Sequence, residues 1–341
     1  MRPLLRPKAV TARAVLLWSL AAAGGVLLAM FIALASGPTS VQWEKLLGGQ
    51  PLEPTEKAIL LDIRLPRVLL TGLVGMALGV SGVVLQALLR NPLAEPFVLG
   101  ISSGAALGAL SSMALGASVL HLATPMAAFL GAMGTVLLVL AVGGGRGRLD
   151  MTRVLLTGVI VNAFFTSLIM LILSLSRAEQ IHSMMFWLYG DLSGARYGHA
   201  KIVAPGALLA LTVIWGQARG LNIMGIGEQT ALQLGVQVER SKMILLGVTS
   251  LLTGAVVSVS GLIGFVGLIV PHLVRMLLGA DHRLLIPVTA LGGAAFLVLA
   301  DAVARTLVSP AEVPVGVITA AMGAPFFVLL LRTKVTRWDP Y

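Results

Sequence analysis

Residues 64–108 read RLPRVLLTGLVGMALGVSGVVLQALLRNPLAEPFVLGISSGAALG, two apolar segments joined by a charged elbow at residues 90–92. Each apolar flank is close to the roughly 20 residues that an α-helix needs to cross a bilayer. Glycines recur three or four residues apart in both flanks, a spacing typical of closely packed membrane helices, at Gly75, Gly79, Gly100, Gly104 and Gly108. The elbow is therefore predicted to lie at a membrane surface.

The composition of the whole chain sets the class of protein. Of 341 residues, 57% are apolar and 11% are charged, and the mean hydropathy is +0.96. One soluble core cannot bury so much apolar surface, so lipid must solvate it. We predict an all-α polytopic membrane protein with a single transmembrane domain over residues 1–341. The chain has no cysteine, which excludes disulfides, thiolate metal sites and cysteine nucleophiles.

Ten apolar spans can be traced along the chain, and an even number places both termini on the same side of the membrane. They lie near residues 14–36, 66–89, 97–117, 122–142, 153–175, 200–217, 242–260, 262–279, 284–301 and 314–331. The first span follows four basic residues and ends in Ala33-Leu34-Ala35, which resembles a signal-peptidase site. Its apolar run exceeds the roughly 7 to 15 residues of a signal sequence, so a retained helix is favoured over a cleaved one.

The distribution of basic residues orients the chain. About two thirds of the 24 Lys and Arg residues fall at the termini and in the loops on their side, so that side carries the net charge of +10. The positive-inside rule then places both termini in the cytoplasm of a bacterial inner membrane protein. A basic rim facing anionic lipid explains the charge without any nucleic acid.

Several kinds of site are missing from the sequence. No Asp or Glu lies in the middle of a predicted span: Asp301 is at the end of one span, and Glu312 lies beyond it. Ion-coupled carriers usually need a titratable carboxylate at mid-membrane, so this absence disfavours ion-coupled transport. The chain lacks a phosphate-binding loop and an H-E-x-x-H pair, and its five histidines are scattered. We therefore expect no catalytic residue, no metal site and no cofactor bound by this chain.

The longest loop on the cytoplasmic side covers about residues 218–241. Glu228 near a helix start, apolar Ala231 and helix-stopping Gly235 indicate a short surface helix followed by a turn. Such a pattern fits an ordinary connecting helix. It also fits a helix that lies along the membrane and docks into a groove on a cytoplasmic partner.

Four segments in this order resemble the permease subunits of the FecCD-type ABC importers for ferric siderophores, haem and cobalamin. They are residues 64–108, LNIMGIGEQTALQLGV from 221, SGLIGFVGLIVPHLVRMLLGADHR from 260 and AEVPVGVITAAMGAPFF from 311. The resemblance implies a ten-helix type II ABC importer permease that pairs with a second permease copy or paralogue. It also implies two ATP-binding subunits, which bind ATP and Mg, and an external substrate-binding protein.

The resemblance also assigns roles to residues. Arg64, Arg67 and Arg305 match arginines that face acidic residues of the binding protein, although arginines at span ends also commonly snorkel to the headgroups. Glu228, Ala231 and Gly235 match the coupling helix that meets the ATPase. The positions that close the path at its cytoplasmic end are matched by Asn91, Leu93, Met151 and Thr152.

Small and polar side chains recur every four residues in the fifth span, at Gly158, Asn162 and Thr166, and therefore share one helical face. This stripe could bind a neighbouring helix or line the translocation path, and the resemblance implies the path. Together these features predict import of an iron chelate, a ferric siderophore or haem, by alternating access. A cobalamin importer remains an alternative, and an ion-coupled secondary transporter, a channel and a membrane-embedded enzyme are further ones.

Overall fold

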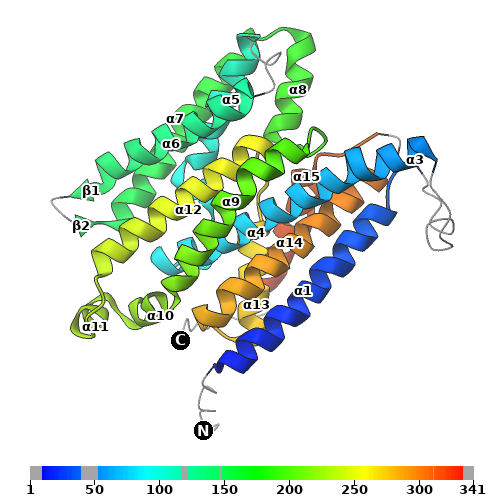
Figure 1. The fold of residues 1–341 in the computed structure, drawn as a ribbon. Coiled ribbons are helices and arrows are strands. Elements are labelled where there is room, and N and C mark those ends of the chain that lie inside the picture. Colours follow the sequence, from blue (N-terminus) through cyan, green and yellow to red (C-terminus); the bar gives the residue numbers. More distant parts are fainter. Residues whose placement is uncertain (1–9, 40–52, 117–121, 146–147, 310, 333–341) are drawn as a thin grey trace.

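The computed structural model describes residues 10–39, 53–116, 122–145, 148–309 and 311–332. A helix corresponds to each of the ten predicted spans, which confirms the all-α membrane fold (Figure 1). These helices are α1 (Ala12–Ala35), α4 (Leu65–Leu88), α5 (Ile101–Ala114), α6 (Ala123–Gly143), α7 (Met151–Leu175), α9 (Tyr197–Gly216), α12 (Val238–Ser260), α13 (Val266–Leu278), α14 (His282–Thr306) and α15 (Val315–Arg332).

Short elements connect the long helices. Helix α3 (Pro54–Ala58) and the π-helical turn η1 (Ile59–Arg64) run directly into α4, while the 3-10 turn η2 (Pro96–Leu99) precedes α5. The others are α8 (Ala178–Leu188), α10 (Ala218–Ile226), α11 (Glu228–Gln233) and the antiparallel pair β1 (Gly144–Gly145) and β2 (Arg148–Leu149). Figure 1 shows the two strands, α10 and α11 at one end of the bundle, which we call the α11 end. Helices α3 and α8 lie toward the opposite end, which we call the α8 end.

Two of the predicted spans, 97–117 and 262–279, form shorter helices than expected, of 14 and 13 residues. Among the described residues, seven helical runs are long and apolar enough to cross a membrane, whereas α5, α13 and α15 are shorter apolar helices. At 1.5 Å per residue, the 13 residues of α13 extend only about 20 Å, so they cross part of a bilayer of about 30 Å. The residues before α13 explain its late start, because Gly261 and Phe265 have positive φ values of 66° and 68° that interrupt a helix. Half-length helices of this kind are typical of transporters, where irregular backbone lies inside the protein.

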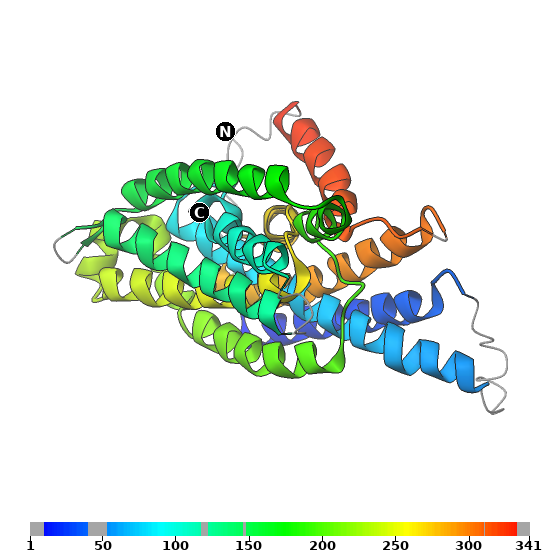
Figure 2. The same ribbon diagram turned by 90° about the horizontal axis from the view of Figure 1, so that it is seen from above.

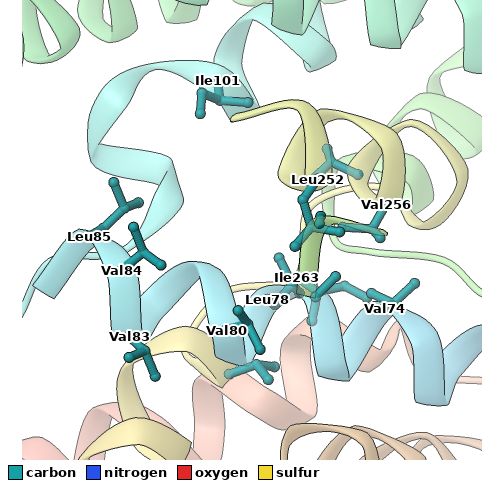
Figure 3. Close-up of a cluster of buried hydrophobic side chains, with 14 of the residues drawn as sticks. Val74, Leu78, Val80, Val83, Val84, Leu85, Ile101, Leu252, Val256 and Ile263 are labelled. Carbon is teal, nitrogen blue, oxygen red and sulfur yellow. The ribbon is translucent and has the colours of Figure 1, made fainter. Parts of the chain in front are cut away.

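Helix α4 forms the centre of the bundle. In its most apolar window 83% of the residues are buried, compared with 11% in α1, which lies at the edge. Figure 3 shows apolar side chains of α4, including Val74, Leu78 and Leu85, converging with residues of α5, α12 and the segment before α13. The packing of α4 against α12, α13 and α14 therefore makes it the scaffold for both ends of the molecule.

Small residues allow the helices at the centre to come into backbone contact. A Cβ atom added to Gly75 of α4 would collide with the backbone carbonyl of Gly293 in α14, and one added to Gly293 would collide with that of Gly75. Gly104 of α5 and Gly131 of α6 are related in the same way. The glycine spacing in the sequence thus did indicate close helix packing.

Helix α15 lies at the margin of the bundle, as Figure 2 shows. Its inner side contacts α13 through Phe327, which packs with Leu268 and Ile269. Helix α1 lies against α14 and buries Ala29 and Ala33 beside Val298. Both marginal helices present much of their apolar surface outward, as expected for helices surrounded by lipid or by a second chain.

Candidate partner-binding surfaces and transport path

The three arginines expected to dock a binding protein lie at the α8 end, but their side chains are buried within the chain. Arg64 donates hydrogen bonds to the carbonyl oxygens of Leu34, at 2.8 Å, and Thr39. Arg305 donates to the carbonyl oxygen of Ala33 at 3.1 Å. These bonds hold the end of α1 against the start of α4 and the last turn of α14.

A single carboxylate brings two of these arginines together. The two oxygens of Asp301, which is only 1% exposed, lie 2.9 Å from Nη2 of Arg67 and 3.1 Å from Nε of Arg305. Nη1 of Arg67 also lies 2.8 Å from an oxygen of Glu312. Arg67 therefore binds both acidic groups, and the network joins α4, α14 and the segment before α15. The docking role of the arginines stays a prediction, because in the described state their guanidinium groups are occupied inside the chain.

The sequence contained a signal for part of this network. Asp301 precedes Arg305 by four residues, a spacing that places opposite charges on the same side of a helix. Nothing local, however, indicates that Arg67 would reach Asp301 across 234 residues of chain. Beside the network lies a surface hollow of about 410 Å³ lined by Arg67, His182, Asp191 and Glu312. The α8 end thus combines a closed ion network with an open surface hollow whose lining is mainly apolar.

At the opposite end, α11 and the turn after it form the predicted coupling segment. Gly235 has a φ of 82°, its N–H donates to the carbonyl of Leu232, and the N–H of Val236 donates to that of Ala231. This pair of bonds is the Schellman arrangement that ends helices, and a left-handed residue is required there. Gly235 therefore has the helix-stopping role that the sequence predicted.

The side of α11 that faces outward differs from the one expected. Ala231 is 0% exposed and lies in the core of the chain, so it does not form the apolar contact surface. That surface is formed instead by Leu232 and Leu234, which are 59% and 63% exposed, together with Ile226 at the end of α10. The difference arises because adjacent residues of a helix point about 100° apart, so Ala231 faces the core while Leu232 faces outward, and Leu234 follows the helix at its C-cap.

Glu228 connects the coupling segment to the rest of the α11 end. Its carboxylate lies 2.7 Å from Nζ of Lys242 and 4.0 Å from the guanidinium of Arg90, in the elbow after α4. Lys242 is buried and also lies 3.4 Å from Glu239, whose other oxygen accepts a hydrogen bond from the N–H of Leu149 at 2.8 Å. The network therefore links α11 to both segments in which the gate residues were predicted. Lys242 was not singled out in the sequence, although its position three residues after Glu239, on the same side of a helix, is the signal that could have identified it.

The predicted gate residues lie in two tightly turned segments. The side chain of Asn91 accepts a hydrogen bond from the N–H of Leu93 at 2.9 Å, and this turn exposes the Leu93 side chain. In the other segment Asp150 caps α7 by accepting from the N–H of Thr152 at 2.9 Å. Met151, the first residue of α7, packs partly buried against the core. The gate role itself stays a prediction.

The predicted path residues of α7 divide into two groups. Gly158 is buried, and a Cβ atom added to it would lie 2.7 Å from the carbonyl oxygen of Val98 and 2.9 Å from Cα of Leu99, so it lets α7 pack against η2. Asn162 and Thr166 are exposed on the outside of the single chain, and the Thr166 hydroxyl donates to the carbonyl of Asn162. A polar side chain is costly in hydrocarbon, which favours a second chain or a watery path beside this face.

Two polar contacts inside the bundle were not anticipated from the sequence. The amide of Gln86 in α4 donates to the carbonyl of Gly267 in α13 at 3.0 Å and accepts from Arg275 at 3.1 Å. Glu95, just before η2, accepts a hydrogen bond at 3.3 Å from the N–H of Phe265, directly before α13. Both contacts satisfy polar groups around the half-length helix α13, and their partners are more than 150 residues apart in sequence.

Comparisons with known proteins agree with this architecture. A family model described as the FecCD transport family matches residues 25–333. The chain is 44% identical over 283 residues to the cobalamin import system permease protein BtuC of Halobacterium salinarum, covering 83% of this chain and 76% of the relative. It is 45% identical over 288 residues to the hemin transport system permease protein HmuU of Yersinia pestis, covering 82% and 85%.

A solved structure gives the same result for the fold. The structure is that of a putative metal-chelate type ABC transporter in an inward-facing conformation. One of its chains matches this chain with a TM-score of 0.83 and 32% sequence identity. The match covers 92% of this chain and 98% of the other. The family match and the structural match each cover most of the chain. The chain therefore belongs to the FecCD transport family and is a permease of an ABC importer.

Proposed function

We propose that this chain forms the membrane path through which an ATP-driven importer moves an iron chelate, a ferric siderophore or haem, into the cytoplasm by alternating access. A second permease copy or paralogue completes the path along the exposed side of α7. Two ATP-binding subunits, which hold ATP and Mg, bind at the α11 end. An external binding protein delivers the ligand at the α8 end.

The exposed apolar surface of α11 carries this proposal. Ile226, Leu232 and Leu234 are largely exposed although they lie in a loop outside the apolar spans. Apolar side chains gathered outside the hydrocarbon region favour a partner that covers them. The ion pair between Glu228 and Lys242 then supplies a rigid connection from that partner to α12.

The buried carboxylate of Asp301 supports ATP-driven transport over ion coupling. A carboxylate that binds a transported proton or cation must be open to exchange with the path. Asp301 is instead enclosed and contacted by the guanidinium groups of Arg67 and Arg305. An ion-coupled mechanism would therefore have to break a buried ion network in every cycle.

The choice of ligand rests on the relatives. These relatives include a hemin transport permease at 45% identity and a cobalamin import permease at 44% identity. The metal-chelate description of the solved structure favours an iron chelate or haem. A cobalamin importer is the second candidate because of the archaeal relative.

Reconstituted transport tests the proposal directly. The permease would be inserted in liposomes with ATP-binding subunits and a binding protein from its own organism, and uptake of a ferric siderophore, haem and cobalamin would be compared. We expect uptake of one iron ligand that requires ATP, and no uptake with an ATPase variant that cannot hydrolyse it. Cobalamin uptake alone would select the second candidate, and uptake driven by an ion gradient without ATP would refute the proposal.

A further inference from the structure

A groove opens between α1, α9, α10 and α14 at the α11 end. It has a volume of about 750 Å³, and its lining is mainly apolar. The lining residues are Val10, Ala12, Val15, Leu16, Ser19, Leu211, Thr212, Trp215, Gly216, Ala218, Arg219, Arg283 and Pro287. Ser19 lies seven residues beyond Ala12 along α1, so the groove reaches about 10 Å into the bundle.

Two arginines mark one end of this groove. Arg219 is the second residue of α10 and is exposed, and its side chain makes no hydrogen bond or ion pair with the part of the chain that the structure describes. Arg283, near the start of α14, uses Nε and Nη2 to bind Asp281, with Nη2 at 2.6 Å from Oδ2. Its other terminal nitrogen, Nη1, makes no bond to a described residue, and the side chain is 39% exposed. Both arginines thus keep donors for an anion.

Acidic groups near the groove do not cancel this charge completely. Asp281 accepts hydrogen bonds from Arg283 and Asn222; partial burial raises its pKa, but these bonds outweigh burial and lower it to about 2. The carboxylate is therefore ionised and neutralises the charge of Arg283 in part. Arg219 contributes the remaining positive charge. Arg13, in the first turn of α1, is also exposed and directly follows the lining residue Ala12. The balance at this end of the groove is positive.

Trp215 indicates how deep in the membrane the groove opens. Its indole N–H donates to the carbonyl oxygen of Arg283 at 3.0 Å, and half of the side chain remains exposed. Tryptophan is enriched at the level of the lipid headgroups, where one edge is polar and the ring is apolar. An apolar groove with Trp215, Arg219 and Arg283 at its mouth therefore has its polar end at headgroup level and its apolar end in the hydrocarbon.

We propose that this groove binds one anionic phospholipid, whose phosphate lies between Arg219 and Arg283 and whose acyl chain lies along α1 and α9 past Ser19 and Leu211. Basic pockets between membrane helices on the cytoplasmic side are suited to anionic headgroups, and guanidinium groups bind phosphate oxygens in pairs. The bound lipid bridges α1, α14 and the start of α10. It thereby steadies the segment that leads into α11. The inference uses the cytoplasmic orientation proposed above, but its test does not require transport.

Native mass spectrometry of the purified full chain would count bound lipids in mixtures of dioleoyl phosphatidylglycerol and dioleoyl phosphatidylcholine. We expect one phosphatidylglycerol to be retained in preference to phosphatidylcholine. Arg219→Gln should weaken its retention about fivefold, which corresponds to the roughly 1 kcal/mol that a basic residue contributes near an anionic surface. Arg240→Gln is the matched control, because Arg240 is an exposed arginine on the same side whose contact is with Gln237.

A second pair of variants tests the acyl chain. Ser19→Phe should fill the groove and reduce retention as strongly as Arg219→Gln, whereas Leu20→Phe, at an outward-facing position next to it, should not. Inorganic phosphate should not displace the lipid. Equal retention of both lipids, equal losses for Arg219→Gln and Arg240→Gln, or displacement by phosphate would each overturn the proposal. Tighter lipid retention by a truncated chain that begins at Val10 would also overturn the proposal. Residues 1–9 would then be the normal occupant of the groove.

Discussion

At the scale of single residues, Asp301 has the most consequential environment. One nearly inaccessible carboxylate contacts guanidinium groups from two helices, and Glu312 binds Arg67 from a third segment. Removing one member of a buried ion network is strongly destabilising because the others stay buried and unpaired. This cost constrains any docking role of the arginines, since a binding protein would have to offer carboxylates that replace Asp301 and Glu312.

Asp301→Asn should therefore destabilise the isolated permease by about 3 to 5 kcal/mol, the cost of leaving buried charges uncompensated. Glu312→Gln, at a side chain that is 34% exposed, should cost much less. The thermal midpoint of the purified chain in detergent is the measurement. Similar midpoints for the wild type and Asp301→Asn would show that water or lipid reaches the arginines.

The docking hypothesis needs the same measurement as its control. Arg64→Glu and Arg305→Glu place a carboxylate beside the carbonyl oxygens of Leu34 and Ala33, so both reversals should lower the stability of the permease itself. Loss of binding-protein affinity is informative only for a variant that remains folded. Arg305→Lys keeps the charge and is the milder substitution to compare.

At the scale of elements, α11 separates surface from core within one turn. Ala231 faces the chain and Leu232 faces outward, so the same substitution should have different effects at neighbouring positions. The half-length helices α5 and α13 are a second feature at this scale. Their irregular entries are stabilised by contacts such as the one between Glu95 and the N–H of Phe265.

Ala231→Asp should lower the stability of the permease by about 3 kcal/mol or more, because it buries an unpaired charge. Leu232→Asp should change stability by less than about 0.5 kcal/mol, as is usual for exposed positions. The second variant should nevertheless lose co-purification with the ATP-binding subunits, since it places a charge on the exposed apolar surface. Normal co-purification of Leu232→Asp would refute this surface as the docking site.

At the scale of the whole molecule, polar networks lie at both ends of a tightly packed centre. The pair Glu228 and Lys242 connects α11 to α12, and Glu228 also approaches Arg90 in the elbow that contains Asn91 and Leu93. We therefore expect a displacement of α11 by a partner to reach the elbow through Glu228 and Arg90. This chain of contacts is a physical route from the coupling segment to the predicted gate.

A cysteine at Leu93 tests that route. The native chain has no cysteine, so a single thiol at this exposed position can be labelled without background. In the assembled transporter its rate of labelling should differ between the ATP-bound and nucleotide-free states. Glu228→Gln should reduce that difference, because it removes the charge that approaches Arg90 in the elbow. Labelling that is equal in all states would place Leu93 outside the gate.

The sequence by itself determined the membrane class, the ten helices and the close packing that their glycines allow. These features follow from the length of the apolar segments and from the spacing of nearby residues, neither of which depends on distant parts of the chain. The turn at Gly235 was likewise predictable, because its left-handed φ of 82° is a local requirement.

Only the tertiary structure decided which way the functional side chains face. The buried positions of Arg67, Ala231 and Gly158 follow from contacts with Asp301, the core and η2, which come from segments distant in the sequence. The sequence pattern around a charged or small residue at the end of a span is the same whether its side chain is buried in the protein or exposed to a partner. Its orientation is determined by how the helices pack together, and periodicity within one helix cannot specify that packing.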